Sequence, residues 1–523
     1  MTYKGNQGFK LNRRTLLAGA AAGSAALWVP GLAGKPAAAA PKAGGHFRIG
    51  VGGGATTDTL DPATYASEML TLVAYCIGNH LTEITPSGDL VPELAESFEP
   101  SADAKTWRFN LRKGVTFHNG QPLTAQDVIL SYQQHMGEDS KSAAKSSVGQ
   151  IESFKADGDH TVVFTLAAGN ADFPYLLSDY RLPILPAKDG KLEWQQGQGT
   201  GPYMLQNFNP GVAATFTKNP NYWKADAAYF DSVEIITILD PAARQNALVT
   251  GEVDAIDTVD PKTANRLGQV SGLRLLEVPS RLHHAWPMRI EAKPFDNVDF
   301  RLAIKWAIDR EDLLRKILFG RGTVGNDQPL SAVYRYYADL PQRSRDIDKA
   351  KFHLKKSGLG ENVAVDLSAS DGAYSGAVDA AVLIKEQLAP AGINVNVVRE
   401  PKDGYWSSVW RTKPWCAAYW YGRPTADWMF STAYAAESPF NDTGWQNAPF
   451  NTLLVEARAE LDHKKRAEMY GEMQSLVRDQ AATAVTTFSN HVMAVSDKIK
   501  HPEQISGVYA LDGGKAVERW WFA

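Results

Sequence analysis

Residues 405–430, YWSSVWRTKPWCAAYWYGRPTADWMF, combine many aromatic side chains with a few polar groups that could bind a ligand. Small-molecule sites are mostly apolar and aromatic, with a few placed polar groups that fix orientation. This composition therefore suits the wall of a ligand cleft. We expect that wall to contain Tyr419, Trp420 and Tyr421 with the adjoining Gly422 and Arg423. A buried strand with a flanking helix is the plainer interpretation of the same run.

Patterns for covalent or metal chemistry are missing from the sequence. It has no H-E-x-x-H, G-x-S-x-G or G-x-x-x-x-G-K-[ST] motif. His283 and His284 are adjacent, but neighbours on a strand point to opposite faces and make a poor metal pair. Residues 50–55 match the dinucleotide pattern G-x-G-x-x-G/A, yet the turn-rich residues 56–62 open no helix for a pyrophosphate. We predict no enzyme activity, no metal site and no cofactor.

The stretch 107–132 has the strongest local pattern in the chain. Aromatic and aliphatic residues alternate with polar ones over 107–111, which predicts a strand. Residues 115–117 predict a second short strand, and a turn signal follows. Thr124, with Asp127 three residues on, predicts a helix N-terminus close to a capping box.

Strands and helices alternate through most of the chain, which favours an α/β fold. The same criteria of period and punctuation locate the main elements. Helices are predicted at 67–81, 242–250, 300–308, 346–358 and 380–388, with two more inside 450–480. Strands are predicted at 46–49, 161–166, 233–239, 484–495 and 517–522, and residues 391–397 predict a turn followed by an alternating strand.

Composition is that of an ordinary globular protein, with 44% hydrophobic and 21% charged residues in 523. The formal net charge is −4, and residues 1–39 hold five Lys or Arg and no acid, so the rest carries −9. An acidic body argues against general nucleic-acid binding. Cys76 and Cys416 build no disulfide framework or metal spacing. Two free buried thiols are favoured, and a bond between them is the alternative.

The N-terminus has the form of a twin-arginine export signal. Asn12-Arg13-Arg14-Thr15-Leu16-Leu17 precedes an Ala/Gly-rich run that is too short and weakly apolar for a membrane span. Ala37-Ala38-Ala39 fits a small-residue cleavage site. We predict that 1–39 is a signal peptide and that the rest is exported to the periplasm, not embedded in a membrane. A disordered basic tail is the alternative.

Several stretches resemble the signature of bacterial solute-binding proteins of the peptide and nickel type (family 5), which serve ATP-driven importers. The densest match is 107–132, where nearly every fixed position of the family pattern is present. Further matches, in the family's order, are GTGPY at 199–203, NPNYW at 219–223, GEVDA at 251–255 and PFDNVDFRLAIKWAIDR at 294–310.

The resemblance implies a two-lobed periplasmic-binding-protein fold, of class II and the large cluster C type, with an extra subdomain on the first lobe. Lobe I is expected at 46–82, 196–290 and 490–523. The inserted subdomain is expected at 83–195, and lobe II at 291–489. A solute receptor of this kind closes about a hinge.

The resemblance also locates a ligand site, and this sequence departs from the family there. Peptide-binding relatives carry an aspartate for the peptide's α-ammonium where this chain has Gly422, and an aspartate-proline where it has Thr425-Ala426. Asp427 is the nearest carboxylate. Arg289, three residues after Trp286, stands where relatives often have asparagine. The loop that contains Thr57 resembles the family's first cleft loop.

Two arginines at cleft positions, Arg289 and Arg423, favour an anionic ligand because the guanidinium fork binds a carboxylate in a bidentate way. Each could instead pair with a carboxylate of the protein. We therefore predict a monomeric receptor for a carboxylate-bearing solute, such as an opine-like amino-acid conjugate, that docks on the transmembrane permease subunits of an ABC importer and their ATPases. The alternatives are a di- or oligopeptide receptor and, more remotely, an exported hydrolase.

Overall fold

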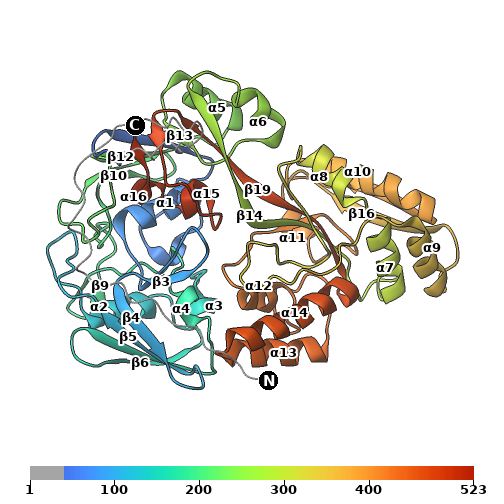
Figure 1. Ribbon diagram of the computed structural model, residues 1–523, viewed down its shortest axis with the longest axis horizontal. Coiled ribbons are helices and arrows are strands. Elements are labelled where there is room, and N and C mark those ends of the chain that lie inside the picture. Colours follow the sequence, from blue (N-terminus) through green and yellow to red (C-terminus); the bar gives the residue numbers. More distant parts are fainter. Residues whose placement is uncertain (1–40) are drawn as a thin grey trace, which may run out of the picture. The chain divides into compact units, whose positions relative to one another are not determined.

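The computed structural model describes residues 41–523, and the predicted export signal lies outside them. The fold is a two-lobed α/β arrangement built around separate hydrophobic cores (Figure 1). We call the cluster around β1 (His46–Val51) the first core and the cluster around β16 (Val363–Ala369) the second core. The cluster around β5 (Thr106–Leu111) is the third core. A satellite cluster packs under the helices α12 to α14. No helix of residues 41–523 combines the length and apolarity that crossing a membrane requires.

The first core is covered by one face of a mixed sheet. Its central strand β1 (His46–Val51) pairs in parallel with β12 (Ser232–Thr237) and β13 (Ala255–Ile256). Phe47, Ile49 and Val51 on β1 are fully buried, as period 2 requires of a core-facing strand. The remaining elements around this sheet are α1 (Glu68–Ile77), β10 (Tyr203–Asn209), β11 (Ala213–Lys218), α5 (Pro241–Thr250) and α6 (Pro261–Leu267).

Two long antiparallel strands, β14 (Leu273–Pro287) and β19 (Thr483–Ser496), run from the first core to the second (Figure 1). Leu276 of β14 packs in the first core, and Trp286 of the same strand packs in the second. Their pairing register shifts between Pro279 and His283. Such an irregularity unpairs residues and bends a strand, so the change of core coincides with a natural bending point.

The third core lies under a four-stranded antiparallel sheet of order β4-β5-β7-β6. The alternation predicted at 107–111 is β5 (Thr106–Leu111), and the predicted capping box of Thr124 and Asp127 starts α2 (Ala125–Gln133). The strand predicted at 115–117 is wrong. That segment forms only a single bridge, between Thr116 and Pro122. It cannot pair with β5, because both edges of β5 are occupied by β4 (Ala95–Pro100) and β7 (Thr161–Leu166). Other elements here are β2 (Thr82–Ile84), β3 (Leu90–Pro92), α3 (Lys145–Val148), β6 (Ile151–Ala156), α4 (Phe173–Leu176), β8 (Ala187–Lys188) and β9 (Lys191–Leu192).

The second core lies between helices and the parallel pair β16 (Val363–Ala369) and β17 (Ile393–Arg399). The helix predicted at 346–358 is α9 (Ile347–Lys356), whose N-cap is Asp346. The other elements on this side are α7 (Val298–Ala307), α8 (Arg310–Ile317), β15 (Gly322–Val324), α10 (Ala377–Leu388), α11 (Tyr405–Ser408), β18 (Ala418–Trp420), α12 (Ala426–Ala433), α13 (Ala448–Ala459) and α14 (His463–Gln480).

The C-terminal segment corrects a second sequence prediction. The sequence predicts a strand at 517–522, but the first three of these residues belong to the helix α16 (Ala516–Arg519). Only β21 (Trp521–Phe522) is a strand. Val517 is buried in the first core as part of a helix, and a short apolar run fits a buried strand as well as a buried helix, so its apolarity could not separate the two. The other elements of this segment are β20 (Ile499–Lys500) and α15 (Ala510–Gly513). Cys76 and Cys416 are free and buried, as favoured. The predicted domain borders stay predictions.

Candidate ligand-binding site

Three of the predicted site residues lie inside the protein and contact other protein groups. Trp286 is fully buried in the second core. Trp420 donates a hydrogen bond from Nε1 to Oδ2 of Asp442 at 3.1 Å, and Asp427 pairs with Arg458 at 3.1 Å. These contacts account for their burial, and a role in ligand binding stays a prediction for each.

Three further predicted residues make local contacts or are exposed to solvent. Arg289 pairs with Glu291 and donates from Nη1 to the carbonyl oxygen of Arg411 at 2.5 Å. This is the carboxylate pairing that the sequence left open. Thr425 caps α12, where its Oγ1 accepts a backbone N–H of the first turn. Thr57 is exposed in the loop after β1.

An aromatic surface that solvent reaches is formed by Tyr419, Tyr421 and Trp406. Tyr421 is 52% exposed, and its ring stands nearly perpendicular to the ring of Tyr419, with the two ring centroids 5.1 Å apart. Trp406 packs against Tyr419 in the same way at 5.3 Å. Desolvation raises the pKa of Tyr421, and the neighbouring Tyr419 and the Glu68 carboxylate add to the rise. The charge of Glu68, at the start of α1, therefore acts on both tyrosines.

Gly422 packs directly against the backbone of β14. Strands β14 and β18 are antiparallel, and His283 of β14 pairs with Trp420 of β18. Two residues further along this register, Gly422 lies opposite Arg281. A Cβ atom at Gly422 would lie 1.8 Å from the Cβ of Arg281 and 2.8 Å from its carbonyl oxygen. Real Cβ contacts do not come this close, so only glycine fits. The position that the family resemblance equates with an ammonium-binding aspartate therefore has no room for a side chain in this structure.

Arg423 lies at the edge of the aromatic surface with its charge unneutralised. Its Nη1 donates to the carbonyl oxygen of Tyr421 at 3.3 Å, and its guanidinium lies 5.9 Å from the ring centre of Trp428. Within residues 41–523 no carboxylate lies at ion-pair distance from it. Its backbone N–H donates to the hydroxyl of Tyr334 at 3.2 Å. Arg423 is therefore the predicted site residue whose charge can serve a ligand.

The structure adds two tyrosines and one arginine that the sequence did not single out. Burial raises the pKa of Tyr334 to about 12, while the charges of Arg281 and Arg423 act in the opposite sense. Burial also raises the pKa of Tyr509, and Arg423 again opposes the rise. Both hydroxyls thus lie in the field of arginines. Neither tyrosine belongs to a motif, so sequence pattern carried no signal for them.

Contacts between α13, α14 and the turn before α4 join distant parts of the chain. Arg466 on α14 pairs with Asp172 at 2.8 Å, and both side chains are buried. The backbone N–H of Ala171 donates to the carbonyl oxygen of Arg458 at 2.7 Å. These bonds link the third core with the helices α13 and α14 in the state described.

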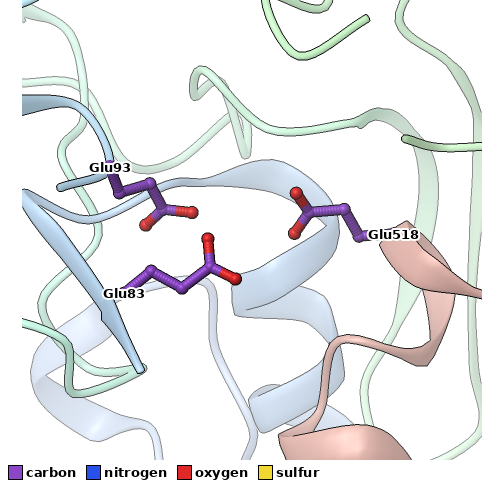
Figure 2. A group of neighbouring side chains, drawn as sticks. All are labelled: Glu83, Glu93 and Glu518. Carbon is purple, nitrogen blue, oxygen red and sulfur yellow. The ribbon is translucent and has the colours of Figure 1, made fainter. Parts of the chain in front are cut away.

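The carboxylates of Glu83, Glu93 and Glu518 point toward one another (Figure 2). One oxygen of each lies within 4.8 Å of the others. Three such groups could ligate a cation, but protein cations already neutralise them. Lys515 lies 2.7 Å from Glu93, 3.0 Å from Glu83 and 3.5 Å from Glu518. Lys224 contacts the same three carboxylates at 2.7–2.9 Å. We interpret the group as a structural ion network and call it the terminal network.

A cavity of about 30 Å³ lies beside the terminal network and reaches Tyr509, Asp179 and Pro424. A water molecule needs roughly 10–15 Å³ of such space, so the cavity suits ordered water. It is too small for an organic solute in this state.

Two cores joined by paired strands, with an aromatic and cationic surface open to solute, define a two-lobed solute-binding receptor. The model of the family "Bacterial extracellular solute-binding proteins, family 5 Middle" matches residues 89–442. The chain belongs to this family, whose members are solute receptors of ABC importers.

Known relatives span most of the described chain. The dipeptide-binding protein of Escherichia coli K12 is 26% identical over 454 residues, covering 79% of this chain and 83% of the relative. AgaA of A. tumefaciens R10, in complex with agropinic acid, has a TM-score of 0.75 at 24% identity and covers 92% of this chain and 99% of its own. DppA of Helicobacter pylori, in complex with the peptide STSA, gives the same TM-score and identity, with 92% and 98% covered. These structural likenesses show the fold.

Proposed function

We propose that this protein captures a small carboxylate-bearing solute, an opine-like compound or another amino-acid conjugate, and delivers it to the permease of an ABC importer. The observation that carries the proposal is Gly422. Its contact with Arg281 leaves no room for the ammonium-binding aspartate of peptide receptors. The adjacent Arg423 offers an unneutralised guanidinium instead, and a charge-assisted bidentate bond to carboxylate is among the strong contacts in proteins.

The mechanism is capture followed by closure. The solute rests on Tyr419 and Tyr421 with a carboxylate on Arg423, and the register shift in β14 and β19 lets the two sides turn toward each other. Closure is favoured only by contacts that the solute makes better in the closed form than in the open form. The proposal includes twin-arginine export to the periplasm, action as a monomer, and docking on the transmembrane subunits with their ATPases.

Two comparisons bear on the solute from opposite sides. The AgaA structure was determined with agropinic acid, an acidic compound, which supports the proposed class. The curated relatives are mostly named for dipeptides and oligopeptides, which favours a peptide receptor as the second candidate. A peptide receptor without the aspartate would need another carboxylate for the α-ammonium, and Glu68, whose charge acts on Tyr419 and Tyr421, is the candidate.

The test is to purify the mature protein from its own host without refolding and to measure the mass of what denaturation releases. Because binding to the native state stabilises the complex by mass action, a tight ligand stays bound during purification. We expect a single acidic small molecule. A spread of peptide masses would contradict the proposed solute class and support the peptide receptor.

Arg423→Ala should then lower the affinity for the released solute about tenfold to a hundredfold, since a hydrogen bond to a charged group contributes about 1.5–3 kcal/mol. Titration calorimetry of the stripped protein measures this. The matched control is Arg315→Ala, which removes an exposed arginine paired with Asp312 on α8 and should leave affinity unchanged. Equal affinities for wild type and Arg423→Ala would remove Arg423 from the site.

A further inference from the structure

Arg281 is buried at the point where β14 leaves the first core. Its side chain is 8% exposed, and it lies inside the register shift between Pro279 and His283. Burying a charged group costs free energy unless a counter-ion or several hydrogen bonds compensate it. The contacts of its guanidinium therefore decide whether it is a structural group or a binding group.

Those contacts leave the charge of Arg281 largely uncompensated. Nη2 donates to the carbonyl oxygen of Val333 at 3.3 Å, and the guanidinium lies 5.0 Å from the ring centre of Tyr334. Nε is buried without a hydrogen-bond partner. Among residues 41–523 no carboxylate lies at ion-pair distance from it. Desolvation accordingly lowers the pKa of Arg281 from its ordinary value.

Arg301 shows how the same chain satisfies an arginine that only holds structure. It is 6% exposed, its Nε is likewise buried without a hydrogen-bond partner, and no carboxylate of residues 41–523 lies at ion-pair distance from it. Its guanidinium donates to three carbonyl oxygens, those of Phe295 at 2.8 Å, Asp296 at 3.3 Å and Gln480 at 2.8 Å. Arg281 has one such acceptor, at 3.3 Å. Burial lowers the pKa of both arginines, and the difference between them lies in the carbonyl oxygens that accept from the guanidinium, one for Arg281 and three for Arg301.

The groups around Arg281 are mostly hydrogen-bond donors. The tyrosines 175, 334 and 509 lie in its electrostatic field, and Arg423 shares two of them, Tyr334 and Tyr509. The Asp179 carboxylate, whose charge raises the pKa of Tyr509, is already paired with Arg181 at 3.2 Å. Two arginines and the tyrosine hydroxyls that share their field form a set of donors that matches an anion.

We infer that Arg281 is a second anion-binding residue, which binds a carboxylate of the solute where β14 and β19 pass from the first core to the second. This inference rests on the proposed function and deepens it. Arg281 and Arg423 would hold acidic groups of one solute around Tyr334 and Tyr509. Because Arg281 lies at the bending point of β14, its carboxylate contact forms where the two sides of the receptor meet.

The first test compares Arg281→Met with the matched control Arg301→Met in ligand-stripped, full-length mature protein. Removing an uncompensated buried charge relieves a cost, so Arg281→Met should raise the thermal midpoint or leave it unchanged. Arg301→Met should lower the midpoint, since it leaves three carbonyl oxygens without donors. A fall for Arg281→Met equal to that of Arg301→Met would show a structural arginine and overturn the inference.

The second test uses malonate as the probe, with chloride and phosphate at equal ionic strength. Malonate should raise the midpoint of wild type and Arg301→Met by about 2–4 °C, through binding to the native state, and should have no such effect on Arg281→Met. Arg281→Lys should retain part of the response. An equal response of Arg281→Met would overturn the inference, and a response to phosphate alone would overturn the assignment to carboxylate.

The two proposals fail separately. If the native protein releases only peptides while the malonate response still depends on Arg281, the proposed solute class is wrong and the anion site stands. If an acidic solute is released and Arg281→Met binds it as tightly as wild type does, the receptor proposal stands and the role of Arg281 is wrong.

Discussion

Gly422→Asp is expected to destabilise the protein by about 3 kcal/mol or more, and it should not create a peptide receptor. The reason is the Cβ atom, which would lie 1.8 Å from the Cβ of Arg281 and force β14 and the segment after β18 apart. Gly422→Ala should therefore cost nearly as much as Gly422→Asp. Urea unfolding of both variants and titration with dipeptides measure the two effects.

The matched control for Gly422 is Gly471→Ala in α14. A Cβ at Gly471 meets its nearest neighbour, Ala338, at an ordinary 3.7 Å. Since alanine is the better helix former, this variant should gain up to about 1 kcal/mol. A Gly422→Asp protein that is as stable as wild type and binds dipeptides would show that the position does have room, and the proposed solute class would lose its main support.

Lys515→Met should cost about 3–5 kcal/mol at pH 7, because removing one partner of a buried ion pair leaves the others uncompensated. In the terminal network it leaves Glu83, Glu93 and Glu518 facing Lys224 and Arg519. The exposed pair of Lys105 and Glu152, 3.8 Å apart, is the control, and Lys105→Met should cost less than about 1 kcal/mol. Urea unfolding measures both.

The terminal network also sets a pH dependence with a definite sign. Burial alone would raise the pKa of Glu93, but Lys224, Lys515 and a hydrogen bond from His80 hold it well below its ordinary value. Burial opposes the same cations at Glu518, whose pKa is lowered to about 2. A carboxyl with a lowered folded-state pKa contributes stability above its unfolded pKa and loses it as the pH falls through the folded pKa.

The free energy of unfolding should therefore drop between about pH 4.5 and pH 2 in wild type. The deficit of Lys515→Met should shrink over the same range, because protonation removes the uncompensated charges. A deficit that is equal at pH 7 and pH 4 would mean that the loss comes from packing of the lysine stem and not from its charge.

Local sequence patterns predicted most elements and the family, and two examples show why. The alternation at 107–111 and the pairing of Thr124 with Asp127 depend only on neighbours in the chain, and both are confirmed. The strand predicted at 115–117 is wrong because the neighbouring strand β5 pairs on both edges with strands from other parts of the chain, β4 and β7. Sequence pattern is weakest where tertiary pairing overrides local preference.

The candidate site was only partly predictable for the same reason. The aromatic run and Arg423 stand out by composition, and the absence of the aspartate at Gly422 is visible in the sequence. The sequence does not show that Arg281 occupies the space beside Gly422. The two residues are 141 positions apart, and only the pairing of β14 with β18 brings them together. Trp286 and Trp420 look like ligand residues by type, but their burial depends on packing across several segments.

The strand order around the first core has a consequence for synthesis. Strand β1, near the start of the described chain, lies beside β13, which pairs in turn with β19 from residues 483–496. The terminal network adds Lys515 and Glu518 to carboxylates at positions 83 and 93. Contacts of such large sequence separation form slowly, because loop closure must precede them. A nascent chain that lacks these last residues exposes the uncovered edge of β13 and leaves Glu83 and Glu93 with Lys224 alone. The first core therefore matures only after translation has passed residue 518.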